Sequence, residues 1–329
     1  MKAVQLHQPG GPEALIYGEV PTPVPSATQA LVRAHAIGIG MPDVLVRTGR
    51  YAWMPPLPAV IGIEMSGVVE AVGRAVTAVK PGDAVWLSAR EAEHRGGCYA
   101  EYAVLEADRL YKLPPGIDLD QAAALSNYQV AYHLLHSTGI AVAGRSMLVR
   151  AAAGGVGSAL IQLARAAGLS VIGLVGSADK VRFVLDQGAT AAIDRRTDDV
   201  RARVLAATQG RGVDLIIDPV GGKNFSDNFP LLAKLGQVLL YGYLDGWPPD
   251  LMAAMRANFA ASPAVRLFTM HTFDDEPTLR AAATHTLLRL LASGAIRPHI
   301  HDRLPLADAR RAHALFESGQ VIGKLLLKP

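Results

Sequence analysis

Residues 147–165, which read MLVRAAAGGVGSALIQLAR, decide the fold class of this chain. An apolar run enters a turn of small residues, and an amphipathic helical pattern leaves it. The first N–H groups of a new helix have no partner within the helix, and the helix dipole adds partial positive charge there. Gly154 lets the backbone approach a phosphate closely, and Gly157 lets the helix pack against the strand. The stretch therefore predicts a dinucleotide-binding unit in which Gly154, Gly155, Val156 and Gly157 hold a pyrophosphate.

Strand and helix patterns alternate after this turn. The apolar runs that predict further strands are Leu169–Val175, Val213–Pro219 and Gln237–Gly242. The segments with helical periodicity are Lys180–Gln187, Asp198–Gln209 and Ser226–Leu235. Strands that alternate with helices form a parallel sheet covered on both faces. We therefore expect an α/β protein with a Rossmann-type doubly wound sheet.

The chain has 329 residues, a length that favours two domains over one. Its first ~120 residues contain short alternating segments separated by Pro and Gly, which indicates a β-rich domain. Helical and extended patterns near the C-terminus end in the strand Gly323–Lys328. We expect this last part to rejoin the first domain. The predicted division is a discontinuous β-rich domain of residues 1–121 and 268–329 and a dinucleotide-binding domain of residues 122–267.

Composition excludes several classes of protein. The net charge is +3, and the basic residues are scattered, which disfavours nucleic acid as a partner. No apolar run reaches the ~20 residues that span a bilayer, and no signal peptide is recognisable. The one cysteine, Cys98, excludes an intrachain disulfide and fits a reducing compartment. We expect a cytoplasmic protein with no membrane partner.

Several motifs occur in an order that a known family shares. They are Gly10–Glu13, Gly38–Asp43, Gly62–Val69, Lys80–Asp83, Gly97–Tyr102, Ala151–Gly157, Asp218–Gly221 and Gly319–Leu327. With these motifs the chain resembles the medium-chain dehydrogenase/reductases, and within them the zinc-free quinone oxidoreductase-like branch. The resemblance implies a GroES-like catalytic domain, a Rossmann domain and a cofactor cleft between them.

The end of the second predicted strand favours NADPH as the cofactor. An NAD-specific site carries a carboxylate there, about 20 residues after the Gly-rich turn, to bind the ribose hydroxyls. This chain has Gly176 and Ser177 at that place, with Lys180 in the next turn. The resemblance implies that Lys180 contacts the 2′-phosphate. Arg195, after the third strand, is a second candidate because its guanidinium binds phosphate as a fork; each cation also has the plain alternative of a solvated surface residue.

Four more residues are predicted to line the cofactor. Gly242 and Tyr243 follow a strand end, where open α/β sheets bind ligands. The resemblance places them on the nicotinamide or substrate side, with Gly221 near the nicotinamide ribose. Lys324 matches a lysine of the family's closing strand that lies near the cofactor, although a surface role is equally compatible with its position.

We predict that no metal is bound. The resemblance matches Gly40 and Ile63 to the Cys and His that hold catalytic zinc in zinc-dependent relatives. Neither residue has a donor atom, whereas zinc takes at least three protein ligands as a rule. A reduction without a Lewis acid suits acceptors that delocalise charge, such as quinones, enals, enones and enoyl thioesters. The developing oxyanion then needs a hydrogen-bond donor.

Tyr51 is our first candidate for that donor, since its place matches a tyrosine of enoyl-reductase relatives. Tyr128 and Asn127 are further candidates, and all three have packing as an alternative role. Trp53 and Met54 beside Tyr51 predict a hydrophobic, electron-poor acceptor. Trp247 and Phe259, in the other domain, are further candidates for the apolar edge of the acceptor site.

The predicted function is an NADPH-dependent, zinc-independent reductase of quinones or α,β-unsaturated carbonyls. Two alternatives stay open at this point. One is an enoyl-thioester reductase of a specific pathway, and the other is an NADPH-binding protein with low turnover. The resemblance also implies a homodimer.

Overall fold

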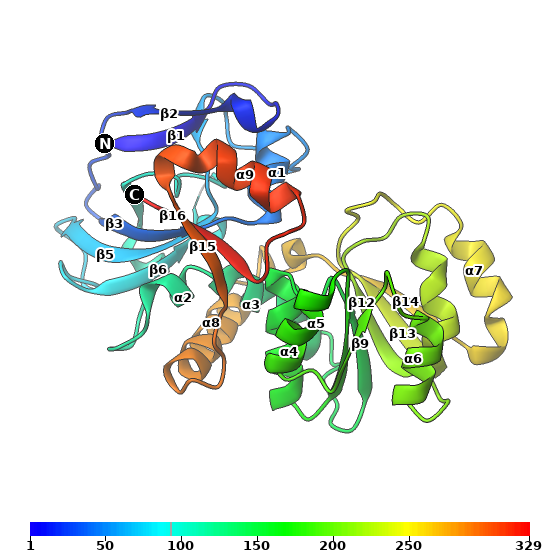
Figure 1. The fold of residues 1–329 in the computed structure, drawn as a ribbon. Coiled ribbons are helices and arrows are strands. Elements are labelled where there is room, and N and C mark those ends of the chain that lie inside the picture. Colours follow the sequence, from blue (N-terminus) through cyan, green and yellow to red (C-terminus); the bar gives the residue numbers. More distant parts are fainter. Residues whose placement is uncertain (93) are drawn as a thin grey trace. The chain divides into compact units, whose positions relative to one another are not determined.

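The computed structural model describes residues 1–92 and 94–329 and divides them into two compact units (Figure 1). Unit 1 comprises Met1–Ser126 and Thr284–Pro329, and unit 2 comprises Asn127–Ala283. The predicted boundaries lay at residues 121/122 and 267/268. The second boundary lies later in the structure because Phe273 stacks on His133, with ring centroids 4.2 Å apart, and Arg280 donates to the carbonyl of Phe273.

Strands and helices alternate in unit 2, as expected from the sequence. Its strands are β9 (Ser146–Arg150), β10 (Ser170–Val175), β11 (Ala191–Asp194), β12 (Val213–Asp218), β13 (Leu232–Leu240) and β14 (Ala264–Leu267). Its helices are α4 (Gly155–Ala166), α5 (Ala178–Asp186), α6 (Val200–Ala207) and α7 (Leu251–Ala257), while α3 (Leu125–Tyr132) and α8 (Pro277–Ala292) cross the boundaries between the units.

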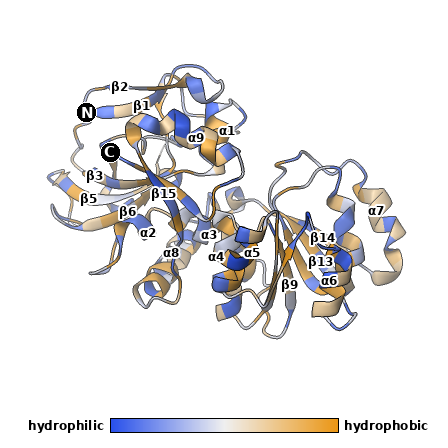
Figure 2. Ribbon diagram, in the orientation of Figure 1, coloured by the Kyte–Doolittle hydropathy of each residue, from blue (hydrophilic) through white to orange (hydrophobic). Residues whose placement is uncertain are grey.

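The six strands of unit 2 form one parallel sheet in the order β11-β10-β9-β12-β13-β14. Helices α4 and α5 cover one face and α6 the other (Figure 1). Hydrophobic residues run along the central strands (Figure 2), and Leu148, Ile216 and Val238 are among those fully buried. This confirms the predicted doubly wound sheet.

One predicted helix of unit 2 is wrong. Ser226–Leu235 reads as helical, but the structure has a 3-10 helix at Phe225–Leu231, and β13 begins at Leu232. Pro230 lies inside this segment, and a proline has no N–H to continue an α-helix. Leu235 has a φ of 63°, which is also incompatible with a helix.

Unit 1 is built from β-strands. They are β1 (Lys2–Leu6), β2 (Leu15–Glu19), β3 (Gln29–Gly38), β4 (Ala59–Val60), β5 (Glu64–Val72), β6 (Ala84–Ser88), β7 (Tyr102–Glu106), β8 (Tyr111–Lys112), β15 (Ile300–Pro305) and β16 (Lys324–Lys328). Its helices are α1 (Met41–Arg47), α2 (Leu119–Ala122) and α9 (Ala309–Glu317). A seven-stranded sheet has the order β15-β16-β3-β5-β6-β8, with β7 also on β3, and a smaller sheet has the order β2-β1-β4.

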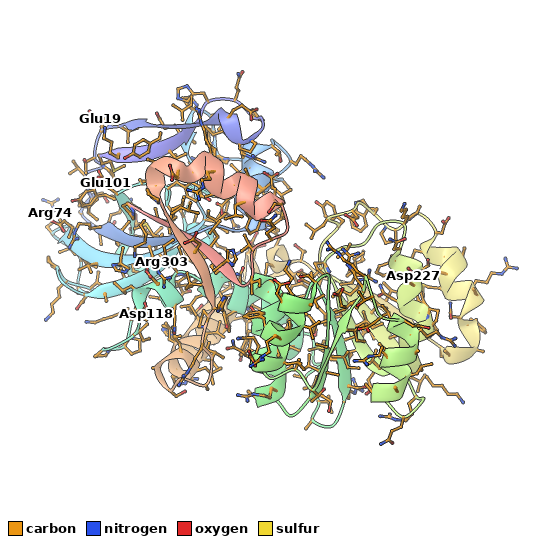
Figure 3. The ribbon with its side chains drawn as sticks, in the orientation of Figure 1. Glu19, Arg74, Glu101, Asp118, Asp227 and Arg303 are labelled. Atoms are coloured by element: carbon orange, nitrogen blue, oxygen red, sulfur yellow. The ribbon has the colours of Figure 1, made fainter. Side chains whose placement is uncertain are left out.

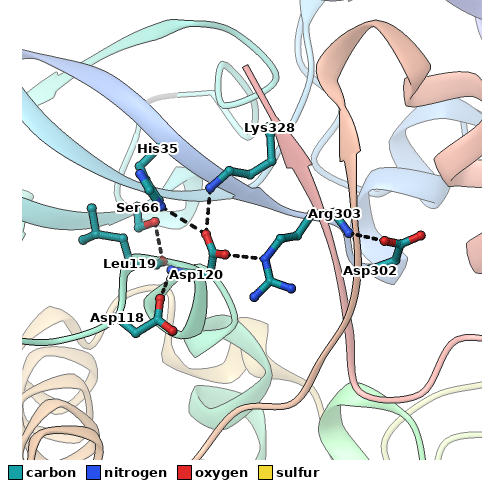
Figure 4. Close-up of polar contacts among 8 residues, drawn as sticks. All are labelled: His35, Ser66, Asp118, Leu119, Asp120, Asp302, Arg303 and Lys328. Carbon is teal, nitrogen blue, oxygen red and sulfur yellow. Dashed lines mark hydrogen bonds and ion pairs between the residues drawn. The ribbon is translucent and has the colours of Figure 1, made fainter.

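The C-terminal segment completes the larger sheet of unit 1. Strand β16 pairs antiparallel with β3, and Leu325, Leu326 and Leu327 are fully buried. Asp120 joins the C-terminal strands to the rest of unit 1 through ion pairs. Its carboxylate binds Arg303 of β15 and Lys328 of β16 as well as His35 (Figure 4). Figure 3 labels Arg303 and also Asp118, whose carboxylate caps α2 by accepting from the N–H of Asp120.

Among the residues that the structure describes, no helix combines the length and the apolar character that crossing a bilayer requires.

Candidate functional site

The Gly-rich turn joins β9 to α4 as predicted. Gly154 is the N-cap of α4, with an extended backbone, and Gly155, Val156 and Gly157 form the first helical turn. A Cβ atom on Gly157 would lie 2.5 Å from the carbonyl oxygen of Ala151, so helix and strand approach more closely than any side chain allows. A Cβ on Gly154 would meet only that same oxygen, at 3.4 Å. The N–H groups of the first turn are thus presented at a helix start with the geometry that binds phosphate.

The C-terminal end of β10 carries no carboxylate. Arg195 lies there instead, since its Nε and Nη2 are 3.6 and 3.7 Å from the position of a Cβ on Gly176. The N–H of Arg195 donates to the carbonyl of Val175, which fixes the residue between the ends of β10 and β11. The cation is exposed. The Arg195 guanidinium is therefore placed to bind an anion that lies next to Gly176.

Ser177 and Lys180 lie beside this arginine at the start of α5. Ser177 is the N-cap of the helix, and Lys180 is half-buried in its first turn. Asp179 between them is exposed, and a hydrogen bond from the Ser177 side chain is the main cause that lowers the pKa of this carboxyl. The structure therefore brings Ser177, Lys180 and Arg195 to one strand end, together with the acidic residue Asp179.

Two loops at the ends of β12 and β13 are joined by backbone hydrogen bonds. Gly222 donates to Gly246 at 2.7 Å, and Asp245 donates to Val220 at 2.9 Å. Gly221 has a φ of 64°, and a Cβ there would lie 2.6 Å from the Gly246 oxygen. On the other loop, a Cβ on Gly242 would lie 2.6 Å from the Pro219 oxygen. Glycines are thus required where the two loops meet.

A buried polar group anchors these loops, and the sequence reading missed it. Asp218 is fully buried, and its carboxylate accepts from the N–H groups of Val220 and Gly221 and from the side chain of Asn228. Arg150, the last residue of β9, donates to Asn228 at 2.9 Å. The signal available in the sequence was an Asp at a strand end, directly before the turn that contains Gly221.

In unit 1, the two positions that the resemblance matches to zinc ligands do converge. A Cβ on Gly40 would lie 3.6 Å from Cδ1 of Ile63. Asp43 lies next to them, fully buried, and its Oδ2 accepts from the N–H of Gly40 at 2.8 Å. Burial raises the pKa of Asp43 to about 7. In the described part of the chain, no three His, Cys, Asp or Glu side chains are arranged to hold a metal ion.

Lys324 is buried in an ion pair. Its Nζ lies 2.5 Å from Oε1 of Glu64, and the two side chains are 3% and 0% exposed. The other oxygen of Glu64 accepts from the N–H of Ser126 and from the indole of Trp86. The pair passes over Gly38, where a Cβ would lie 2.6 Å from Cε of Lys324. The predicted contact of Lys324 with a cofactor stays a prediction, but the structure gives its ammonium a partner within the protein.

The candidate proton donors lie in different units. Tyr51 of unit 1 is 8% exposed and packs against Trp53, with ring centroids 5.8 Å apart. Asn127 and Tyr128 lie at the start of unit 2. The Tyr128 hydroxyl donates to Gln162 at 3.1 Å, and burial raises its pKa, so this phenol is already used in a structural hydrogen bond. Asn127 is half-buried.

The chain matches two families of known proteins. Residues 26–115 match the family described as alcohol dehydrogenase GroES-like domain, and residues 187–327 match the family described as zinc-binding dehydrogenase. The second description mentions zinc, whereas Gly40 and Ile63 offer no donor atom.

Individual proteins match over the full length. A quinone oxidoreductase of Pseudomonas aeruginosa is 33% identical over 329 residues, which is 100% of this chain and 99% of that protein. The structure of an Escherichia coli quinone oxidoreductase complexed with NADPH has a TM-score of 0.88 at 30% identity, with 100% of both chains covered. The structure of an NAD-dependent alcohol dehydrogenase has a TM-score of 0.89 at 30% identity, again with 100% of both chains covered. The chain therefore belongs to the medium-chain dehydrogenase/reductases, in the quinone oxidoreductase-like branch.

Proposed function

We propose that this oxidoreductase uses NADPH to reduce a quinone or an α,β-unsaturated carbonyl compound without a metal ion. The observation that carries the proposal is the end of β10, where Arg195 lies beside Gly176 and the residues that directly follow the strand, Gly176 and Ser177, have no carboxylate. A carboxylate at that place would repel the 2′-phosphate of NADPH, and a guanidinium attracts it. The quinone oxidoreductase of E. coli, crystallised with NADPH, supports the same cofactor.

In this proposal, different segments of unit 2 bind different parts of NADPH. Gly154, Gly155, Val156 and Gly157 hold the pyrophosphate through the first N–H groups of α4. Ser177, Lys180 and Arg195 bind the 2′-phosphate. Gly221, Gly242 and Tyr243 line the nicotinamide side, where the loops after β12 and β13 are already fixed by hydrogen bonds to one another. The hydride comes from the bound cofactor.

Tyr51 is the proposed donor to the oxygen of the acceptor. An ordinary phenol has a pKa of ~10, so it is protonated at neutral pH and stabilises a developing oxyanion by donating a hydrogen bond. Tyr128 is a weaker candidate because its hydroxyl already donates to Gln162. Asn127 is the remaining amide candidate. The side chains of Gly40 and Ile63 have no atom that binds zinc, so this proposal has no zinc ion to act as a Lewis acid. Hydrogen bonds then have to stabilise the negative charge on the acceptor oxygen.

Steady-state kinetics with purified protein test the proposal. NADPH and NADH are compared with a naphthoquinone, a 2-enal and crotonyl thioester as acceptors. We expect a lower KM for NADPH and turnover of the quinone or the enal. Preference for NADH would contradict the cofactor assignment. Selective turnover of the thioester would support the pathway-specific enoyl reductase, and tight NADPH binding with no turnover would support the binding-protein alternative.

We also propose that the protein is a cytoplasmic homodimer. Strand β14 is the outer strand of its sheet, and Leu267 on it is 60% exposed. Unpaired strand edges associate readily with one another. The single cysteine, Cys98, is buried and fits a reducing compartment. Sedimentation equilibrium tests the dimer, and a single species with the mass of one chain would contradict it.

A further inference from the structure

Two aromatic rings stack on each other in the loop that follows β13. The centroids of Tyr243 and Trp247 are 5.1 Å apart, and their planes are inclined by 15°. The two residues are 41% and 62% exposed, and Leu244 between them is 53% exposed. Burying the apolar surface of these three side chains would be favourable, because water is then removed from it. A contiguous exposed apolar patch is accordingly a frequent mark of a binding site.

The loop that carries these rings is held rigidly. Leu244 donates to the carbonyl of Pro219 at 3.2 Å, and Gly246 donates to the carbonyl of Tyr243 at 2.9 Å. These bonds add to the two that join the same loop to Gly222 and Val220. A ligand that stacks on the rings therefore orders little of the backbone when it binds, which keeps the entropic cost low.

The position of the rings indicates what binds there. They lie at the carboxyl end of a parallel sheet, which is the edge where open α/β sheets bind ligands. They directly follow Gly242, which we place beside the nicotinamide. The two rings are uncharged, and the exposed Asp245 between them in the loop adds negative charge, so a neutral, flat ligand fits the ring face better than an anionic one. An electron-poor ring gains most from stacking on an electron-rich indole, because their quadrupoles are opposite.

We propose that Tyr243 and Trp247 form a stacking platform for the acceptor and make the enzyme favour fused-ring quinones over aliphatic enals and enones. This inference rests on the proposed function and deepens it. Trp247 presents the more exposed ring and receives the acceptor, whereas Tyr243 supports Trp247 from behind. An aliphatic enone has no ring face to stack, so the platform contributes little to its binding.

The test combines two measurements on the variants Trp247→Ala and Trp247→Phe. Isothermal titration with menadione, a naphthoquinone, measures binding without NADPH. Steady-state kinetics then compare kcat/KM for menadione and for 2-cyclohexen-1-one. Met252→Ala is the matched control, since Met252 is a 76% exposed apolar residue of α7 outside the loop.

For Trp247→Ala we expect menadione to bind about 10-fold more weakly, with a similar loss in kcat/KM for menadione. The value for 2-cyclohexen-1-one should change by less than about two-fold, and Trp247→Phe should recover most of the menadione affinity. Unchanged menadione affinity in Trp247→Ala, or no binding of menadione to the natural protein, would overturn the platform. An equal loss for both acceptors together with a change of mass in light scattering would also overturn it, and would assign Trp247 to a contact between copies.

The two measurements separate this inference from the function on which it rests. If no acceptor oxidises NADPH, the proposed function fails. The titration still decides then whether menadione binds through Trp247. If quinones are reduced but Trp247→Ala binds menadione normally, only the platform fails.

Discussion

The guanidinium of Arg195 covers Gly176, with Cζ 3.9 Å from the place where a side chain on that glycine would begin. The two residues belong to neighbouring strand ends, and together they set the charge where a cofactor's adenosine ribose is expected. A cation opposite a residue without a side chain leaves room for a phosphate. The same relationship makes the choice between NADPH and NADH accessible to single substitutions.

Arg195→Ala should raise the KM for NADPH by about 10- to 100-fold, because a charge-assisted hydrogen bond contributes ~1.5–3 kcal/mol and every ~1.4 kcal/mol is a factor of ten. The KM for NADH should not change. Gly176→Asp should act more strongly, because it adds the ribose-binding carboxylate and pairs with Arg195. Initial-rate kinetics with both cofactors measure each effect. Equal changes for NADPH and NADH would show that Arg195 does not contact the 2′-phosphate.

Gly157→Ala should lower the stability of the protein, whereas Gly154→Ala should weaken the binding of NADPH. A methyl group on Gly157 would lie 2.5 Å from the Ala151 oxygen and 2.7 Å from the Ala152 oxygen, so α4 has to move away from β9. We expect a loss of ~1–3 kcal/mol of unfolding free energy. A methyl group on Gly154 meets only one atom, at 3.4 Å, so that variant should keep its stability and bind NADPH more weakly. Urea unfolding and a cofactor titration separate the two effects, and equal stability of both variants would contradict the packing argument.

Tyr51→Phe should lower kcat for an enone by about 100-fold, the lower end of the effect of removing one hydrogen-bond donor to an oxyanion. The KM for NADPH should not change. Tyr128→Phe is the matched control, because it removes a phenol that is bonded to Gln162 within the protein. Turnover of the enone is measured for both. Unchanged turnover in Tyr51→Phe would remove Tyr51 as the donor, and a larger loss in Tyr128→Phe would assign the role to Tyr128.

His313 should make the protein less stable in acid. Its Nε2 lies 3.0 Å from the Tyr99 hydroxyl, and burial together with the nearby Arg47 lowers its pKa to about 3 from an ordinary 6.5. Above that ordinary value neither the folded nor the unfolded chain protonates this ring, and the stability is full. As the pH falls from 6.5 toward 3, only the unfolded chain takes up the proton, and the unfolding free energy drops by up to ~1.4 kcal/mol per pH unit.

Urea unfolding at about pH 7 and about pH 5 measures this effect, since both lie within the range where a His titrates when unfolded. His313→Gln keeps a polar group in place without a titratable ring, so its stability should depend less on pH. The same pH dependence in both proteins would mean that His313 is not the group responsible.

Lys324→Met should destabilise unit 1. The substitution leaves Glu64 buried without its cation, and breaking such a pair costs ~3–5 kcal/mol. Adding Glu64→Gln removes the uncompensated charge and should restore part of the loss. Thermal unfolding of the single and double variants measures both changes. A variant that keeps its stability but loses NADPH affinity would instead support the predicted contact of Lys324 with the cofactor.

The sequence predicts features that depend on neighbouring residues and does not predict those that join distant ones. The strand, turn and helix of residues 147–165 follow from a local pattern, and the structure has them as expected, whereas the cofactor contacts at the turn and at the end of β10 stay predictions. The pair Lys324–Glu64 joins residues 260 positions apart, and Tyr99–His313 joins residues 214 apart, so no periodicity reveals them. The error at Ser226–Leu235 has a different cause, because apolar spacing typical of a helix outweighed the effect of Pro230. Strand β14, Ala264–Leu267, was also missed, since it is short and largely exposed.

The pairing of β16 with β3 has a consequence for biosynthesis. Strand β3 leaves the ribosome early and pairs with β5 and β7, but Ile37 and Gly38 at its end pair with β16, which is made much later, at Lys324–Lys328. Unit 2 has all of its strands well before that moment and is free to fold while translation continues. Until β16 is made, Ile37 and Gly38 leave a short strand edge unpaired, and unpaired strand edges are the places where a chain is prone to wrong pairing.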